Sequence, residues 1–220
     1  MTLNTHSLSQ ALNSKAGGYL TSSLVALAER HPDRLSGCRG GQLSNEQLWH
    51  QVLKIATWLQ RNGVERGGVV LLAFSEDQPW AETVALAVTH AGGVVSVLPK
   101  DISEHRFSGI TENCDLACVF LDAGTAHLQK NIQTCCITVW MNEGFSTGEW
   151  NEAEFSELLG TKAAWGMPFP GQPDDAAFLV FDESDSVEGE TWSHNRLRNL
   201  KPDPLRLIAS EARLELEIRR

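Results

Sequence analysis

The first half of the chain alternates between helical and strand-like spacings of apolar residues. The clearest helix begins after Ser44, which forms a capping-box pattern with Gln47, and it ends before Gly63, where a glycine commonly follows a helix. Its apolar face keeps a period of 3.6 residues, through Leu48, Val52, Ile55, Ala56 and Leu59. The continuous apolar run at residues 69–74 that follows has the length of a buried strand.

Strands and helices continue to alternate along the chain. A helix that starts at Pro79 and ends at Gly92 connects the first strand to a second one at residues 94–98. A strand, a helix and a strand within about thirty residues are typical of a βαβ crossover, in which the two strands are parallel. Weaker versions of the pattern predict helices at residues 21–30, 103–113, 125–131 and 152–159, a small hairpin at 35–43, and strands at Leu116–Leu121, 135–140 and Ala176–Phe181. We therefore predict an α/β domain with a mostly parallel sheet flanked by helices.

The stretch at residues 174–200 resembles a known family. The strand Ala176–Phe181 leads into a loop of small and acidic residues, after which come Ser193 and His194. This order resembles the phosphate-loop region of the adenylate-forming enzymes, the AMP-dependent synthetases and ligases that include acyl-CoA synthetases, adenylation domains and luciferases. In that family a Thr-Ser-Gly-Ser-Thr-Gly-x-Pro-Lys-Gly loop follows the strand. The resemblance implies that a remnant of this nucleotide-binding loop survives in Ser184, Ser186 and Gly189.

The loop has lost most of the groups that hold a phosphate. The family's hydroxyl and lysine positions fall on Asp182, Glu183, Asp185 and Glu190, and its second glycine falls on Val187. A phosphate site needs glycines, hydroxyl donors and a cation, whereas residues 182–190 carry five carboxylates and no basic residue. One carboxylate about 4 Å from a phosphate charge costs about 4 kcal/mol at an effective dielectric of about 20. We expect ATP and Mg²⁺, the cofactors of the family, not to bind well here. An acidic cation-binding loop is the alternative, but the spacing does not fit the D-x-[DN]-x-[DN]-G pattern, which favours a solvated acidic loop.

The resemblance extends over roughly residues 20–200. The segments that carry it are LVALAERHPDR, GQLSNEQLWHQVLKIATWLQRNGVERGGVVLLAF, WAETVALAVTHAGGVVSVLP and LACVFLDAG. His90 stands where the family commonly has a lysine. The resemblance implies the fold of the N-terminal subdomain of these enzymes. The enzymes continue beyond this region with an adenine-binding segment, a ribose-binding aspartate and a lysine-bearing C-terminal domain. We expect this chain to lack them, and we assign no catalytic residue and no metal ligand.

Three segments are expected from these patterns. Residues 1–20 are polar and predict a loosely held N-terminal segment, residues 21–200 form the α/β domain, and residues 201–220 form a tail unlike the family's continuation. With 220 residues the chain is long enough for a proper core, and 42% hydrophobic and 21% charged residues argue against disorder.

The net charge limits the classes of partner, and the cysteines indicate whether a metal site is expected. The net charge of −10 argues against nucleic acid and anionic membranes, which bind basic surfaces. No apolar run is long enough for a membrane span or resembles a signal peptide, so we expect a cytoplasmic protein. Five cysteines without a C-x-x-C pair predict reduced thiols rather than a metal site.

The function expected from the sequence is that of a truncated and inactive relative of the AMP-dependent ligases. One alternative is a non-catalytic binding or assembly module, in which a protein partner or a second copy covers exposed apolar surface. Another is one half of a split ligase that a separate polypeptide completes. The acidic loop counts against the split ligase, because the phosphate cradle would have to come from this chain.

Overall fold

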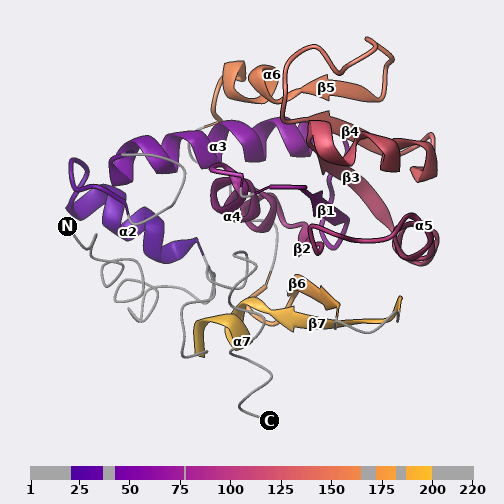
Figure 1. The fold of residues 1–220 in the computed structure, drawn as a ribbon. Helices are drawn as coiled ribbons and strands as arrows, with labels where there is room; N and C mark the ends of the chain where they lie inside the picture. The colour runs from indigo at the N-terminus through magenta and orange to yellow at the C-terminus, as the bar shows by residue number, and fades with distance from the viewer. Residues whose placement is uncertain (1–20, 37–42, 77, 165–171, 182–186, 200–220) are drawn as a thin grey trace.

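A single sheet organises the domain. The computed structural model describes residues 21–36, 43–76, 78–164, 172–181 and 187–199. Within them, seven strands form one sheet in the order β5-β4-β3-β1-β2-β6-β7 (Figure 1). The strands are β1 (Val69–Ala73), β2 (Val94–Val97), β3 (Leu116–Leu121), β4 (Ile137–Trp140), β5 (Glu152–Glu154), β6 (Ala176–Phe181) and β7 (Gly189–Ser193). Every neighbouring pair is parallel except β6 and β7, which are antiparallel. The predicted α/β fold with a mostly parallel sheet is confirmed.

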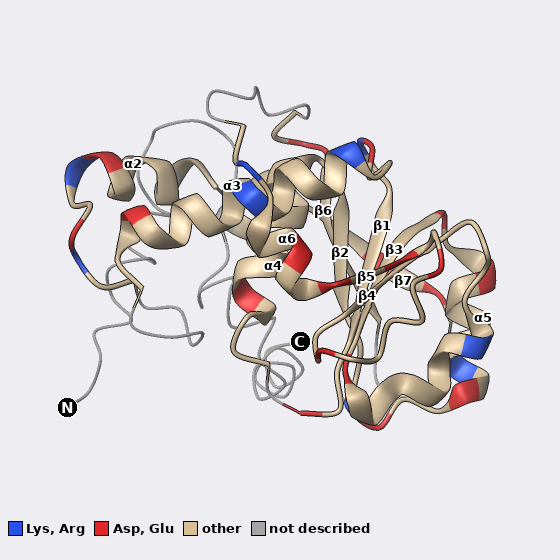
Figure 2. Cartoon of the chain, turned by 90° about the horizontal axis from the view of Figure 1, so that it is seen from above, with Lys and Arg blue, Asp and Glu red and all other residues tan. Residues whose placement is uncertain are grey.

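Helices cover both faces of the sheet. They are α2 (Ser22–Arg30), α3 (Asn45–Arg61), α4 (Ala81–Ala91), α5 (Glu104–Asn113), α6 (Phe155–Gly160), α7 (His194–Asn199) and the 3₁₀ helix η1 (Ala123–Asn131). Figure 2 shows the sheet between α3, α4 and α6 on one side and α5 on the other. None of the helices in the described part of the chain is long and apolar enough to cross a membrane.

The side chains on the two faces of β1 pack in two separate hydrophobic cores. Val70 and Leu72 pack in the core beneath α2, α3, α4 and α6, whereas Leu71 and Ala73 pack in the core beneath α5 and η1. All four side chains are fully buried, which explains why β1 is a continuous apolar run and not an alternating one. Burying each of the larger ones stabilises the fold by about 1.5–3 kcal/mol.

Local sequence signals set the ends of α3 as predicted. The Ser44 hydroxyl accepts a hydrogen bond from the Gln47 backbone N–H at 3.2 Å, and the Gln47 side-chain carbonyl accepts one from the Ser44 N–H at 2.9 Å. At the other end Gly63 has a φ of +89°, a conformation that favours glycine. The capping box and the terminating glycine are therefore confirmed.

Four elements differ from the prediction. The segment predicted as a helix at 125–131 is a 3₁₀ helix, Ala123–Asn131, which begins at the capping residue Asp122. Strands β5 and β7 were not predicted, because Glu152–Glu154 and Gly189–Ser193 lack a strand-like apolar pattern and become strands only by pairing with β4 and β6. As a result, α6 begins three residues later than the helix predicted at 152–159.

Several sequence expectations fall partly or wholly outside the described residues. The segments 1–20 and 201–220 both lie there. The hairpin predicted at 35–43 is described only at its ends, where Leu35 and Ser44 form an antiparallel bridge.

Candidate functional site

The strand order creates a topological switch point between β1 and β3. The chain leaves β1 towards β2 through α4, and it leaves β3 in the opposite direction, towards β4 through η1. In open parallel sheets, ligands bind beyond the carboxyl ends of the strands at such a point. The residues that directly follow β1 and β3 are therefore the first candidates for a site.

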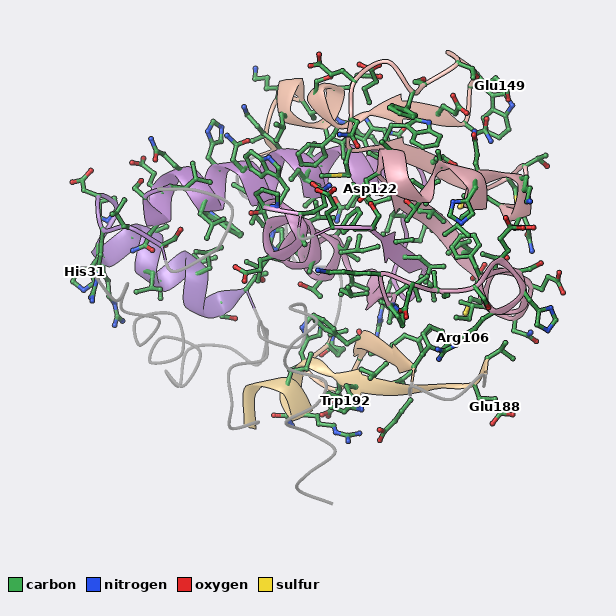
Figure 3. The ribbon with its side chains drawn as sticks, viewed as in Figure 1. His31, Arg106, Asp122, Glu149, Glu188 and Trp192 are labelled. Atoms are coloured by element: carbon green, nitrogen blue, oxygen red, sulfur yellow. The ribbon has the colours of Figure 1, made fainter. Side chains whose placement is uncertain are left out.

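Asp122, the first residue after β3, links these two loops (Figure 3). Its carboxylate accepts hydrogen bonds from the Ser75 N–H at 2.8 Å, the Ser75 hydroxyl at 3.0 Å and the Thr125 N–H at 3.1 Å. Burial alone raises the pKa of the Asp122 carboxyl, but the hydrogen bonds from Ser75 and Thr125 outweigh it and hold the pKa below its usual value. Asp122 is thus a buried, ionised carboxylate whose acceptors are engaged by the protein itself.

Gly124 brings the two loops into close contact. A Cβ atom at this position would lie 2.1 Å from the Ser75 hydroxyl oxygen. Together with the Asp122 hydrogen bonds, this contact means that the chain's own groups occupy the switch point. The sequence interpretation missed Asp122, although two signals were present: an aspartate directly after a buried strand, and a threonine three residues later, as in a helix N-cap.

The second candidate is the turn between β6 and β7, where the remnant phosphate loop was predicted. Gly189 and Glu190 belong to β7, where they pair with Phe181 and Val180 of β6. The other predicted positions, Ser184 and Ser186 with the acidic Asp182, Glu183 and Asp185, lie outside the described residues. The structure therefore places two of the predicted loop positions, Gly189 and Glu190, in a strand.

Glu190 is paired with a cation from the next element. Its carboxylate accepts a hydrogen bond from Arg196 Nη1 at 2.5 Å, and both side chains are about half exposed. The same guanidinium lies 4.3 Å from the ring centroid of Trp192. At the position that the resemblance aligns with the family's lysine, the chain has a carboxylate already held by an arginine.

The described ends of this turn are packed by apolar atoms. A Cβ on Gly189 would lie 2.7 Å from Leu179 Cδ1, and a Cβ on Gly109 of α5 would lie 2.6 Å from Val187 Cγ1. A polyphosphate needs backbone N–H groups and cations around it. The described residues at the two ends of the turn place methyl groups and the Glu190 carboxylate there.

A buried arginine from α5 lies near this turn. Arg106 is only 8% exposed, and it shares a helix face with Gly109, which contacts Val187. Figure 3 shows it between α5 and the β6–β7 hairpin. The sequence interpretation counted no basic residue within residues 182–190, and it missed that a helix distant in sequence brings a guanidinium close to them.

Ser193 and His194 lie at the opposite end of β7 from the turn. The His194 N–H donates to the Asp175 carbonyl at 3.2 Å, beside the start of β6. The five residues of β7 span about 15 Å. The turn after β6 and the Ser193-His194 pair, although close in the sequence, therefore do not share a site. His194 is 1% exposed, and burial lowers its pKa to about 4. These properties are those of a structural histidine at a helix start.

The described cysteines have the properties of unpaired thiols. Cys114, Cys118, Cys135 and Cys136 are free, and Cys38 lies outside the described residues. Burial raises the pKa of Cys118 well above its usual value and that of Cys136 to about 12. In the part of the chain that the structure describes, no three His, Cys, Asp or Glu side chains are grouped as metal ligands.

Comparisons with known proteins agree with the fold. Residues 24–181 match the family described as "AMP-binding enzyme". No curated protein matches the chain significantly. Three similar solved structures are a coronafacic acid ligase from Pectobacterium brasiliense (TM-score 0.69, 14% identity), a luciferase-like enzyme from the mealworm Zophobas morio (0.63, 16%) and a benzoate CoA ligase from Burkholderia xenovorans (0.62, 16%).

The similarity covers most of this chain and less than half of each of those proteins. The three matches cover 80%, 89% and 78% of this chain, but only 35%, 45% and 34% of the respective solved chains. At such identities the structural likeness concerns the fold.

Proposed function

Because the chain belongs to the AMP-binding enzyme family, as its match over residues 24–181 shows, we propose that it keeps the family's α/β scaffold without adenylating a carboxylic acid itself. The observation that carries the proposal is the Glu190–Arg196 ion pair. The resemblance aligns Glu190 with the lysine of the family's phosphate loop.

A glutamate in place of the family's lysine would weaken phosphate binding strongly. A carboxylate about 4 Å from a phosphate costs about 4 kcal/mol at an effective dielectric of about 20, which corresponds to roughly a thousandfold weaker binding. The Glu190–Arg196 pair lowers this cost, but it leaves no free cation of its own for a phosphate, since the guanidinium is engaged by Glu190 and by the Trp192 ring. The apolar packing around Val187 and Gly189 adds to the mismatch.

A non-catalytic binding or assembly role fits these features. The scaffold is well packed, whereas aromatic side chains are exposed at the opposite edge of the sheet from β7; Trp150 is 80% exposed. Exposed aromatic surface on a folded domain is typical of protein contact sites. The other alternative is one half of a split ligase. The Glu190–Arg196 pair counts against it, because the residues of the β6–β7 turn would still face the phosphates.

Pyrophosphate release tests the proposal. We expect none above background when the protein is given ATP, Mg²⁺ and a panel of aryl and aliphatic carboxylic acids. We also expect no heat of ATP binding in calorimetry at millimolar nucleotide. Turnover that Glu190→Lys raises would overturn the proposal, provided that Glu65→Lys does not raise it. Glu65 is an exposed residue outside this turn, so this matched variant controls for the change in net charge.

A further inference from the structure

The loop between β4 and β5 is held in a defined shape by two carboxylates of β5. Glu152 accepts hydrogen bonds from the Thr147 N–H at 2.5 Å and from the Thr147 hydroxyl at 3.0 Å. Glu154 accepts one from the Gly144 N–H at 2.9 Å. Because β5 is itself paired with β4, these bonds fix the loop to the sheet at two points.

This ordered loop displays two large aromatic side chains. Trp150 is 80% exposed and Phe145 is 40% exposed, and in the described part of the chain only Leu35 is a comparably exposed large apolar residue. The Phe145 ring rests on the buried Trp140, with ring centroids 5.6 Å apart. Phe145 is thus anchored on the core at the end of β4, and Trp150, in the same loop, exposes most of its own surface. Tryptophan is enriched among the residues that dominate protein interfaces.

The stretch of sequence around Trp150 is acidic. Between Lys130 and Lys162 the chain has five glutamates and no Lys, Arg or His. Glu152 and Glu154 hold the loop in place, whereas Glu143 and Glu149 are exposed in the same loop as the two aromatic residues. Figure 3 shows Glu149 at the outer rim of the molecule. We refer to Glu143, Phe145, Glu149 and Trp150 as the aromatic–acidic surface.

We propose that the aromatic–acidic surface docks a basic segment of a partner protein, with an arginine or lysine over the Trp150 ring and neighbouring cations beside Glu143 and Glu149. A cation over a tryptophan face is attractive, and nearby carboxylates add to that attraction. A second copy of this chain is the less suitable occupant, because each copy carries a net charge of −10 and would bring like charges together. The inference specifies the binding role proposed above and rests on it. Its test measures peptide binding and not pyrophosphate release, so the two proposals can fail separately.

Fluorescence anisotropy with the full-length protein tests the surface. The probe is a fluorescein-labelled peptide of alternating arginine and glycine, and its control has glutamate in place of every arginine. We expect the arginine peptide alone to bind. Trp150→Ala should weaken binding by roughly tenfold, and Trp150→Phe should weaken it less, because phenylalanine retains an aromatic face. Glu143→Gln with Glu149→Gln should weaken binding by a similar factor and reduce its salt dependence.

Matched variants separate this site from general attraction to an acidic protein. Glu29→Gln with Glu65→Gln removes the same charge at two exposed positions outside the loop, and Leu35→Ala removes another exposed apolar side chain. We expect both to bind the peptide as the unmodified protein does. The proposal is overturned if the unmodified protein does not bind the peptide, if Trp150→Ala leaves the affinity unchanged, or if the matched variants weaken binding equally. A dimer in sedimentation that Trp150→Ala dissociates would also overturn it, in favour of a second copy.

Discussion

Glu190 and Arg196 form an ion pair across the junction of β7 and α7, with Nη1 and Oε1 2.5 Å apart. The two residues are six positions apart, which is not a separation at which side chains of one helix or one strand meet. The pair forms because the chain turns sharply from β7 into α7, and the guanidinium is also positioned by Trp192. The carboxylate at the position aligned with the family's lysine is thus stabilised by its local structure.

Removing this pair should change stability only slightly. Both side chains are about half exposed, and such pairs contribute about 0.2–1 kcal/mol. We expect Glu190→Gln to lower the free energy of unfolding within that range. Arg196→Ala should cost up to about 1 kcal/mol more, because the contact with Trp192 is lost as well. Urea denaturation of both variants and of their combination measures the coupling, and a coupling above about 2 kcal/mol would contradict this interpretation.

Asp122→Ala should be far more damaging than Glu190→Gln. The buried carboxylate accepts hydrogen bonds from the N–H and hydroxyl groups of both Ser75 and Thr125, and its loss leaves the Ser75 N–H without its acceptor. We expect the free energy of unfolding to fall by about 2–3 kcal/mol. Ser75→Ala, which removes only the hydroxyl, should cost about 1 kcal/mol. Equal losses for the two variants in urea denaturation would show that the carboxylate is not the central group.

Gly124→Ala should destabilise the protein by overpacking. The new Cβ would lie 2.1 Å from the Ser75 hydroxyl and 2.5 Å from the Ser75 Cβ. A clash of this kind typically costs about 1–3 kcal/mol. In a Ser75→Gly background both atoms are gone, so Gly124→Ala should then cost much less. Thermal melting of the four proteins of this cycle tests the contact, and an undiminished cost in the Ser75→Gly background would contradict it.

Stability should fall as the pH is lowered from about 6.5 to 4. Burial lowers the pKa of His90 and of His194 from 6.5 to about 4. In this range the unfolded chain binds protons at these residues that the folded protein does not, so the free energy of unfolding decreases as the pH falls. Each shift corresponds to at most about 3 kcal/mol.

A histidine replacement separates this effect from that of carboxylates. His90→Gln should flatten the pH dependence of the urea midpoint between pH 6.5 and 4. Asp175, whose pKa the Arg66 hydrogen bond lowers from its usual 3.8, should lose its stabilising effect only below that range. An unchanged slope in His90→Gln would show that His90 does not titrate as the structure predicts.

Thiol reactivity should differ sharply between adjacent cysteines. Cys135 is exposed, whereas burial raises the pKa of Cys136 to about 12 and that of Cys118 well above its usual value. Since the thiolate is the reactive species, iodoacetamide should label Cys135 at least about ten times faster than Cys118 or Cys136 in the native protein. Tandem mass spectrometry assigns the labelled residue, with urea-unfolded protein as the control in which the rates converge. Rapid labelling of Cys118 in the native protein would contradict the packing of β3.

Sequence patterns predicted the elements whose signals are local. The capping box of Ser44 and Gln47 located the start of α3, and uninterrupted apolar runs located Leu116–Leu121 and Ala176–Phe181 with their correct ends. Strands β5 and β7 were missed because Glu152–Glu154 and Gly189–Ser193 lack the apolar pattern of a buried strand. Both are edge strands that depend on neighbours distant in sequence.

The candidate sites were predictable only in part. The resemblance located the loop after β6, and residue types alone showed that it is acidic. Neither Arg106, brought from α5, nor the pairing of Glu190 with Arg196 could be read from the sequence, because both depend on tertiary contacts. Asp122 was missed for a different reason: a lone aspartate after a strand is common, and only the packing of Gly124 against Ser75 shows what it holds together.

The closure of the gap between β1 and β3 has a consequence for how the domain meets other molecules. The middle of the sheet, where folds with this strand order usually admit small compounds, is taken up by the protein's own hydroxyl and carboxylate groups. The tryptophan-bearing loop, to which the proposed partner binds, lies at an edge of the sheet and away from this point.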